Sequence, residues 1–247
     1  MKRSSVALAD LLQDTPWFRV LTTDEQARVS ADICERWYSA GSVVAHKGEA
    51  AQSWIGVADG LLKVSSVLAS GKVVMFAGVP SGCWVGEGSV LKREVRRYDV
   101  VALRECRVLH LPASTFRALH ESSLAFNQML VGRLNSRLSL YVGMREIDRM
   151  SDPVARVARY IATFFDPVPY PHADASVHLA QSELAELAGL SRTTISLALR
   201  RLELEGLLTT QYGRILVHDL PALKWYEADE GRQPLRRGAG SPAVAVG

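Results

Sequence analysis

The sequence predicts an α+β fold in three parts: an N-terminal antiparallel β-roll of the jelly-roll kind, one long helix, and a C-terminal winged helix-turn-helix. Short apolar runs separated by turn residues fill the stretch from Trp37 to Pro112. A proline-free segment with one apolar stripe follows, from Leu124 to Met150. Beyond Pro153 the pattern becomes short helices and then two strand-like runs. We expect the boundaries to be 17–123 for the β-roll, 124–150 for the long helix, 151–228 for the winged helix-turn-helix and 229–247 for a disordered tail.

The β-roll is predicted from the rhythm of its turns. Glycines separate the apolar runs at positions 41, 48, 60, 71, 82 and 86. Most of these intervals are roughly 8–12 residues, which is typical of an antiparallel sandwich or barrel. The pairs Asp59-Gly60 and Ser70-Gly71 are good candidates for hairpin turns because both favour a positive φ.

Charge and cysteine content limit the class of protein. The chain has 247 residues and a net charge of +3, which permits nucleic-acid binding without arguing for it. Its three cysteines, Cys34, Cys83 and Cys106, are scattered, so we expect neither a metal site nor an iron–sulfur cluster. Sparse cysteines suit a reducing cytoplasm. No run of about 18 apolar residues occurs, so we expect a cytoplasmic protein without a membrane partner.

The long helix carries one apolar stripe. Leu130, Leu134, Leu138 and Tyr141 follow one another at spacings of 4, 4 and 3 residues. This period is expected when two helices pack side by side. The alternative is that the stripe packs on the chain's own β-domain. We interpret it as the seam of a homodimer, because the helix is long for a surface cover.

The stretch from Ser182 to Glu203 predicts a helix-turn-helix. Gly189 can end a first helix in the left-handed conformation, and Ser191 is a good N-cap for a second one. One face of the second helix is apolar and must be buried: Ile195, Ala198, Leu199 and Leu202. The residues that we expect to contact DNA are Ser182, Ser191, Arg192, Thr193, Ser196, Leu197 and Arg200. Such a division lets one side hold the turn while the other enters the major groove.

The chemistry of the polar face suits base reading. Arg192 in the first turn can offer two parallel donors to guanine, while Thr193 and Ser196 can bond base edges or phosphates. Leu197 can meet a thymine methyl group, and Arg200 is placed for phosphate. The alternative is an ordinary helical hairpin with a solvated face.

A two-stranded wing is predicted directly after the second helix. Gly206 ends that helix, and the runs 207–211 and 214–217 are strand-like. Tyr212-Gly213 joins them. The wing favours DNA binding over the plain helical hairpin.

At this point the chain resembles the Crp/Fnr (cyclic-AMP receptor/fumarate–nitrate regulator) superfamily. Gly189-Leu-Ser-Arg-Thr-Thr-Ile-Ser196 is similar to the family's G-x-S-R-x-T-[VI]-[SG] recognition helix, and the order of parts agrees from about Trp17 to Tyr226. The resemblance implies a non-enzymatic, cytoplasmic homodimer with a cyclic-nucleotide-binding-like sensor. Its partners would be a near-palindromic double-stranded DNA operator, a small effector and RNA polymerase.

The sensor motif departs from the cyclic-nucleotide members, which carry G-E-[LI]-[AG] and then R-[ST]-A. There, the glutamate takes a ribose hydroxyl and the arginine neutralises the cyclic phosphate. By position, Glu87 and Arg97 match these two residues. The resemblance implies these effector-site residues: Gly86, Glu87, Gly88, Ser89, Arg96, Arg97, Tyr98 and Tyr141.

Four substitutions argue against cyclic AMP as the effector. Tyr98 and Asp99 replace the small hydroxyl residue and the alanine, and Tyr141 and Val142 replace two hydroxyl residues on the long helix. The identity of the effector stays open. A regulator that binds DNA constitutively, with Tyr98 and Tyr141 plugging its pocket, is the main alternative.

Two other classes of protein fit the sequence less well than a regulator. A cupin-like metalloenzyme needs several converging histidines, and the β-region holds only His46 and His110. A ligand-binding adaptor without DNA output would need an apolar helix-turn-helix face, which this sequence lacks.

Overall fold

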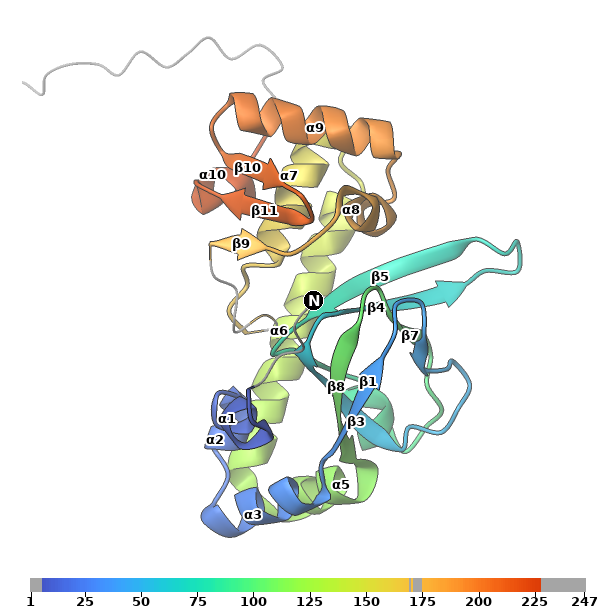
Figure 1. The fold of residues 1–247 in the computed structure, drawn as a ribbon, viewed down its shortest axis with the longest axis vertical. Coiled ribbons are helices and arrows are strands. Elements are labelled where there is room, and N and C mark those ends of the chain that lie inside the picture. The colour runs from blue at the N-terminus through green and yellow to red at the C-terminus, as the bar shows by residue number, and fades with distance from the viewer. Residues whose placement is uncertain (1–5, 169, 171–174, 228–247) are drawn as a thin grey trace, which may run out of the picture.

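The computed structural model describes residues 6–168, 170 and 175–227 (Figure 1). The predicted tail 229–247 lies outside these residues. Three helices precede the β-roll: α1 (Leu8–Gln13), α2 (Pro16–Arg19) and α3 (Thr23–Asp32). None of the three was predicted from the sequence. Helix α3 starts at a capping box, in which Glu25 Oε2 accepts the Thr22 N–H at 2.8 Å.

Two four-stranded antiparallel sheets form the predicted β-roll. One has the order β1-β8-β3-β6 and the other β2-β7-β4-β5. The strands are β1 (Cys34–Tyr38), β2 (Val43–Ala45), β3 (Ser53–Asp59), β4 (Leu61–Val67), β5 (Val73–Pro80), β6 (Trp84–Val85), β7 (Asp99–Ala102) and β8 (Cys106–Pro112). The Ser70-Gly71 hairpin is confirmed, because it joins the paired strands β4 and β5. The Asp59-Gly60 prediction is wrong: Gly60 (φ +106°) turns the chain from β3 in one sheet to β4 in the other.

The sheet that contains β3 separates two hydrophobic cores, one on each of its faces. Ile55 and Val57 face the inside of the roll, whereas Trp54, which precedes Ile55 in the alternation, faces the helices. Outside the roll, Trp54 lies 4.9 Å from Trp17 and 4.7 Å from Trp84, centroid to centroid. This outer aromatic core joins the N-terminal helices and the long helix to the sheet.

Three helices complete the sensor half: α4 (Glu87–Lys92), α5 (Ala113–Ser122) and α6 (Leu124–Ile147). Helix α6 is the predicted long helix, and it runs past the β-roll towards the C-terminal domain (Figure 1). Asp152 caps α7 (Pro153–Thr163) by accepting the N–H groups of Val154 and Ala155. Helix α7 is thus the first of the short helices that the sequence predicts beyond Pro153.

The C-terminal domain is a winged helix-turn-helix, as predicted. Its elements are β9 (Ser176–Val177), α8 (Gln181–Ala188), α9 (Arg192–Leu204), β10 (Leu208–Gln211), β11 (Arg214–Val217) and α10 (Leu220–Lys224). Strands β10 and β11 form the wing, and β9 adds a third strand that the sequence did not reveal. Within the described ranges, no helix is long and apolar enough to cross a membrane.

Candidate nucleic-acid interface and effector pocket

Helix α9 separates a buried face from an exposed one. Gly189 ends α8 with φ +63°, and Ser191 caps α9 by accepting the Thr194 N–H at 3.1 Å. The apolar face is at most 1% exposed at Ile195, Ala198, Leu199 and Leu202. Figure 1 shows α9 along one end of the molecule, opposite the end that carries α3. The helix therefore presents its remaining face outward.

The exposed face of α9 carries the residues predicted to contact DNA. Arg192, Thr193 and Arg200 are exposed, Leu197 is 62% exposed, and Ser196 is half-buried. In the described part of the chain, neither Arg192 nor Arg200 has a hydrogen-bond or ion-pair partner. Both guanidinium groups are therefore available to phosphates or base edges.

Two neighbouring residues differ from that face. Arg201 pairs with Glu205 at 2.5 Å, which occupies its guanidinium within the helix. Ser182 lies in the first turn of α8 and is half-buried. Ser182 is thus less accessible than the α9 residues.

The wing is fixed to the recognition helix by one carboxylate. Glu203 Oε1 accepts the Thr210 N–H at 2.5 Å and the Thr210 hydroxyl at 2.7 Å. At the tip, Gly213 has φ +67° and Tyr212 is fully exposed. The wing therefore holds a set position beside α9 and offers Tyr212 to solvent.

The glutamate of the sensor motif is engaged within the protein. Glu87 is 2% exposed and accepts a hydrogen bond from Trp54 Nε1 at 3.2 Å. Its Oε1 lies 2.8 Å from Arg137 Nη1 and 3.8 Å from Arg133 Nε. The carboxylate expected to take a ribose hydroxyl thus has protein partners instead.

Arg97 does not point into the roll. Its side chain is exposed and pairs with Glu94 at 3.2 Å. Arg96 is the buried arginine: it is 4% exposed, and its Nη2 donates to the Ser53 carbonyl at 2.7 Å. Its Nη1 lies so near Gly86 that an added Cβ there would come within 2.6 Å, which explains the glycine. The distance from Glu87 along the sequence had pointed to Arg97, which is the next residue in the chain.

The backbone explains this shift. Arg93 adopts the left-handed conformation (φ +55°), which changes the course of the chain after α4. The Arg96 N–H then donates to the Glu49 carbonyl at 2.8 Å, and the Arg96 carbonyl accepts the Gly48 N–H at 2.8 Å. These bonds hold Arg96, not Arg97, against the opening of the roll. Of the rest of the motif, Gly88 is half-buried and Ser89 is buried.

Charged and aromatic side chains lie between the roll and α6. Arg137 pairs with Glu87 and interacts electrostatically with the two tyrosines of the sensor prediction, Tyr98 and Tyr141. Burial, with the nearby Glu87 charge, raises the pKa of Tyr98 to about 12, so its phenol stays neutral. A cavity of about 20 Å³ lies beside Arg137, lined in part by Val64, Ala77, Val85, Tyr141 and Tyr170. A larger cavity of about 610 Å³ lies between β4, β5, α6 and α8, and its lining includes Tyr98 and Tyr141.

A larger cavity, of about 650 Å³, lies among β1, β2, β3 and β8. Tyr38 Oη and Ser53 Oγ lie 3.1 and 3.2 Å from the two ring nitrogens of His110. Burial, together with the charges of Arg36 and Arg96, lowers the pKa of His110 to about 4. The cavity therefore combines two guanidinium groups with a neutral imidazole.

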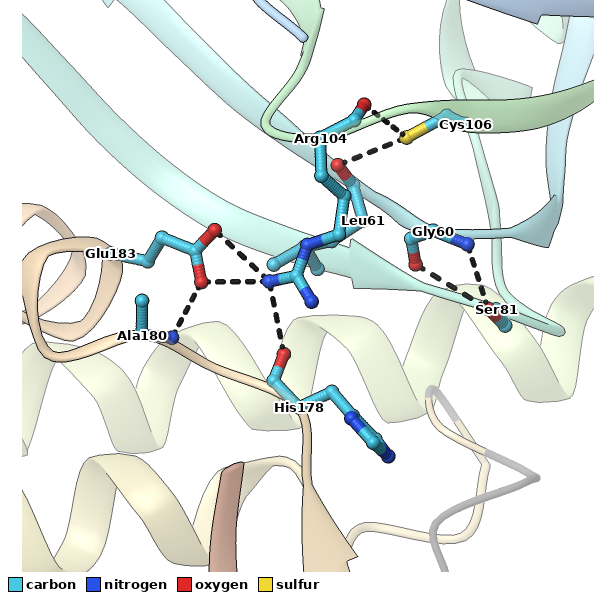
Figure 2. A network of polar contacts seen from close by, with 8 residues as sticks. All are labelled: Gly60, Leu61, Ser81, Arg104, Cys106, His178, Ala180 and Glu183. Carbon is cyan, nitrogen blue, oxygen red and sulfur yellow. Dashed lines mark hydrogen bonds and ion pairs between the residues drawn. The ribbon is translucent and has the colours of Figure 1, made fainter. Parts of the chain in front are cut away.

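Polar contacts join the β-roll to the helix-turn-helix (Figure 2). Arg104 Nη2 lies 3.0 and 2.8 Å from the two carboxylate oxygens of Glu183, and 3.3 Å from the His178 carbonyl. Glu183 also accepts the Ala180 N–H at 2.6 Å, which caps α8. A second pair, Lys63–Glu186, spans 2.9 Å. We call these two ion pairs, Arg104–Glu183 and Lys63–Glu186, the interdomain contact.

The exposed stripe of α6 differs from the predicted one. Leu130 is 2% exposed and packs in the outer aromatic core, so it cannot belong to a seam. Leu134 is half-buried against the same core. The exposed apolar residues of the helix are Leu124, Val131, Leu138, Tyr141 and Val142. Leu130 thus packs on the chain's own β-domain, whereas Leu138 faces outward and Tyr141 is partly covered, at 40% exposed.

The sequence did not reveal four residues that make the contacts described above: Arg104, Arg133, Arg137 and Glu183. Charged residues on a helix or loop usually face water, so no local pattern indicated that these would find partners far along the chain. The i, i+4 spacing of Arg133 and Arg137 does put them on one face of α6. Only the fold brings Glu87 to that face.

Comparisons with known proteins agree with this architecture. Residues 35–123 match the cyclic nucleotide-binding domain and residues 155–226 match the Crp-like helix-turn-helix domain. The chain belongs to the Crp/Fnr superfamily of transcription regulators. It is a regulator with a DNA-binding helix-turn-helix and a cyclic-nucleotide-binding type of sensor domain.

Individual relatives place this member within the superfamily. The transcriptional regulator LdrP of Thermus thermophilus is 28% identical over 181 residues, which are 72% of this chain and 89% of LdrP. A CRP-family transcriptional regulator of known structure, also from Thermus thermophilus, is 25% identical, with a TM-score of 0.56 over 76% of this chain and 94% of its own. FixK2 from Bradyrhizobium japonicum shares the fold, with a TM-score of 0.65 at 16% identity over 77% of this chain and 95% of its own.

Proposed function

We propose that this Crp/Fnr-type regulator is a homodimer that inserts α9 into the major groove of a near-palindromic operator. The observation that carries the proposal is the unpaired, exposed Arg192 in the first turn of α9, opposite a fully buried face. Arg192 would read guanine, Thr193, Ser196 and Leu197 would meet neighbouring base edges, and Arg200 would bind phosphate. Two half-sites about one helical turn apart would fit the two heads of a dimer.

Selection of bound sequences from a random DNA pool tests this proposal. Arg192→Ala should weaken binding by roughly 1–3 kcal/mol and relax the preference at one guanine in each half-site. Arg200→Ala should weaken binding to all sequences alike and reduce the salt dependence. Arg201→Ala is the matched control, because its guanidinium already pairs with Glu205. An unchanged selected sequence for Arg192→Ala would contradict the assignment of the reading face.

The exposed stripe of α6 supports the dimer. Val131, Leu138 and Val142 are each more than 60% exposed on a helix that runs past the sensor domain. Large apolar side chains that follow one helix face usually meet a partner. In this proposal two copies of α6 pack along these residues, with Tyr141 beside the seam next to Val142.

Two residues that a cyclic nucleotide would need are not free for it. Glu87 is engaged by Arg137 and Trp54, and Arg97 lies outside the roll, where it pairs with Glu94. We therefore propose that operator binding does not require cyclic AMP. Calorimetry with cyclic AMP and cyclic GMP should give no low-micromolar site, and neither should improve operator binding. Low-micromolar affinity with a tenfold gain in DNA binding would contradict this.

A second candidate function, control by another effector, is favoured by the cavity of about 650 Å³. Its position inside the roll and its buried Arg96 suit a small anionic molecule. The competing proposal is a constitutive regulator whose pocket is closed by Tyr98, Tyr141 and Arg137. Operator affinity before and after unfolding, dialysis and refolding separates the two. If an effector controls the protein, refolding should change the operator affinity, and an extract of small molecules should restore it. A constitutive regulator should keep the same operator affinity throughout.

A further inference from the structure

A separate cavity of about 290 Å³ lies between α2, α6 and the loop that follows α7. Its walls are mostly apolar, and they include Pro16, Trp17, Trp84, Met129, Pro167 and Val168. It shares no lining residue with the two cavities of the β-roll. The volume is close to the lower end of pockets that hold small molecules. The cavity is therefore large enough for a compact ligand.

Two buried N–H groups beside this cavity lack an acceptor. Trp17 is 2% exposed and Arg133 is 8% exposed, and both line the cavity. Among the described residues, Trp17 Nε1 and Arg133 Nε have no hydrogen-bond partner. Trp54 Nε1, in the same aromatic core, does have one in Glu87. Buried donors in native proteins nearly always find an acceptor, so these two N–H groups are suited to an acceptor that a ligand brings.

The charges beside the cavity are also unbalanced. Arg133 and Arg137 share a single carboxylate, that of Glu87, at 3.8 and 2.8 Å. Glu87 is the carboxylate whose charge acts most strongly on both guanidinium groups. Two buried guanidinium groups thus share one carboxylate within the described ranges, and burial lowers the pKa of Arg133. A buried charge is costly unless it is paired, so an anion would be held strongly here.

We propose that this cavity binds a small organic anion, with its apolar body among Trp17, Trp84 and Met129 and its anionic group on Arg133 and Trp17. The anionic group would accept hydrogen bonds from Trp17 Nε1 and Arg133 Nε and would balance the second guanidinium. A carboxylate, a sulfonate and a phosphonate share this chemistry. The site is distinct from the effector pocket inside the roll.

Such a ligand would join three parts of the molecule. Trp17 and Trp84 belong to the sensor, Arg133 to α6, and Val168 to the loop that leads from α7 into the rest of the DNA-binding domain. An effect on operator binding would rest on the proposed function. Ligand binding in the cavity does not depend on the proposed function. A direct measurement of ligand binding therefore tests the cavity separately from DNA binding.

The indole N–H signals of the full-length protein provide that readout. The chain has five tryptophans, and Trp17→Phe identifies the Trp17 signal in a ¹H–¹⁵N spectrum. Phenylacetate, phenylphosphonate and the neutral phenylacetamide are titrated separately. We expect at least one of the two anions to move the Trp17 signal downfield and to saturate at millimolar concentration or below, because its N–H gains an acceptor. The amide should bind roughly tenfold more weakly, since a charged hydrogen bond is lost.

Substitutions separate the cavity from the rest of the helix. Gly132 lines the cavity, and Gly143 lies on the same helix away from it; in both places an added Cβ meets open space. Gly132→Met should abolish the shift, and Gly143→Met should preserve it. Arg133→Gln should remove the preference for the anions over the amide.

Three results would overturn the proposal. One is a Trp17 signal that neither phenylacetate nor phenylphosphonate moves at millimolar concentrations. Another is equal binding of phenylacetamide, which would mean that the cavity reads no charge. The third is unchanged binding in Gly132→Met, which would place the ligand elsewhere. A response to phenylphosphonate alone would assign a dianion, and a response to phenylacetate would assign a carboxylate.

Discussion

The interdomain contact gives the most direct test of how sensor and DNA-binding domain are joined. Glu183→Gln keeps the shape of the side chain and the α8 cap, because glutamine can also accept the Ala180 N–H. It removes only the charge that faces Arg104. The side chains of Arg104 and Glu183 are 30% and 13% exposed, and the guanidinium contacts both carboxylate oxygens. The pair therefore lies between an exposed ion pair and a buried one.

The magnitude follows from that partial burial. Exposed ion pairs contribute about 0.2–1 kcal/mol, and charge-assisted hydrogen bonds about 1.5–3 kcal/mol. We expect a coupling of about 1–2 kcal/mol, which changes the equilibrium between joined and separated domains by roughly fivefold to thirtyfold. Loss of the charge should shift that equilibrium towards separation by this factor.

A double-mutant cycle of Glu183→Gln and Arg104→Gln, read by urea unfolding, measures the coupling. Hydrogen exchange of the α8 amides should quicken in each single variant. The Lys63–Glu186 pair is the comparison, because Glu186 is 48% exposed and its coupling should be smaller. A coupling below about 0.3 kcal/mol, with unchanged α8 exchange, would refute the view that Arg104 joins the two domains.

Two further outcomes are expected. Val131→Glu with Leu138→Glu should give monomers in sedimentation, since burial of each leucine- or valine-sized side chain contributes roughly 1.5–3 kcal/mol and each occurs twice in a dimer; a variant that stays dimeric would exclude this stripe as the seam. His110 should make stability depend on pH. Its folded pKa of about 4 lies below the ordinary value of 6.5, so its contribution is present above pH 6.5 and is lost as the pH falls towards 4. The loss should reach at most about 3 kcal/mol, and unfolding at several pH values should show a weaker dependence in His110→Gln. An equal pH dependence in the variant would remove His110 from this role.

Local signals explain what the sequence could predict. The Ser191 cap and the left-handed Gly189 depend on a few neighbouring residues, so the recognition helix was predicted at the right place. The wing also follows from a short strand–turn–strand pattern. Such features need no knowledge of the rest of the fold.

Long-range packing explains what the sequence could not predict. Leu130 fits the periodicity of the α6 stripe, yet the outer aromatic core covers it. Arg96, and not the predicted Arg97, is the buried arginine, because the chain turns at the left-handed Arg93 after a short helix. In both cases the spacing along the sequence matched the expected motif. The direction in which the side chain points was decided by elements far along the chain.

The partners of Glu87 bear most strongly on regulation. If a ligand between the β-roll and the long helix is what fixes their relative position, then here side chains already span that gap. Glu87 on α4 meets Arg137 on α6 at 2.8 Å, and Arg133 and Arg137 both donate to the Trp84 carbonyl, at 2.6 and 2.5 Å. Displacing Arg137 would leave Glu87 buried beside a more distant Arg133, which is unfavourable. A cyclic nucleotide would have to compete with this bridge, whereas an anion on Arg133 in the cavity beside α2 would leave it intact.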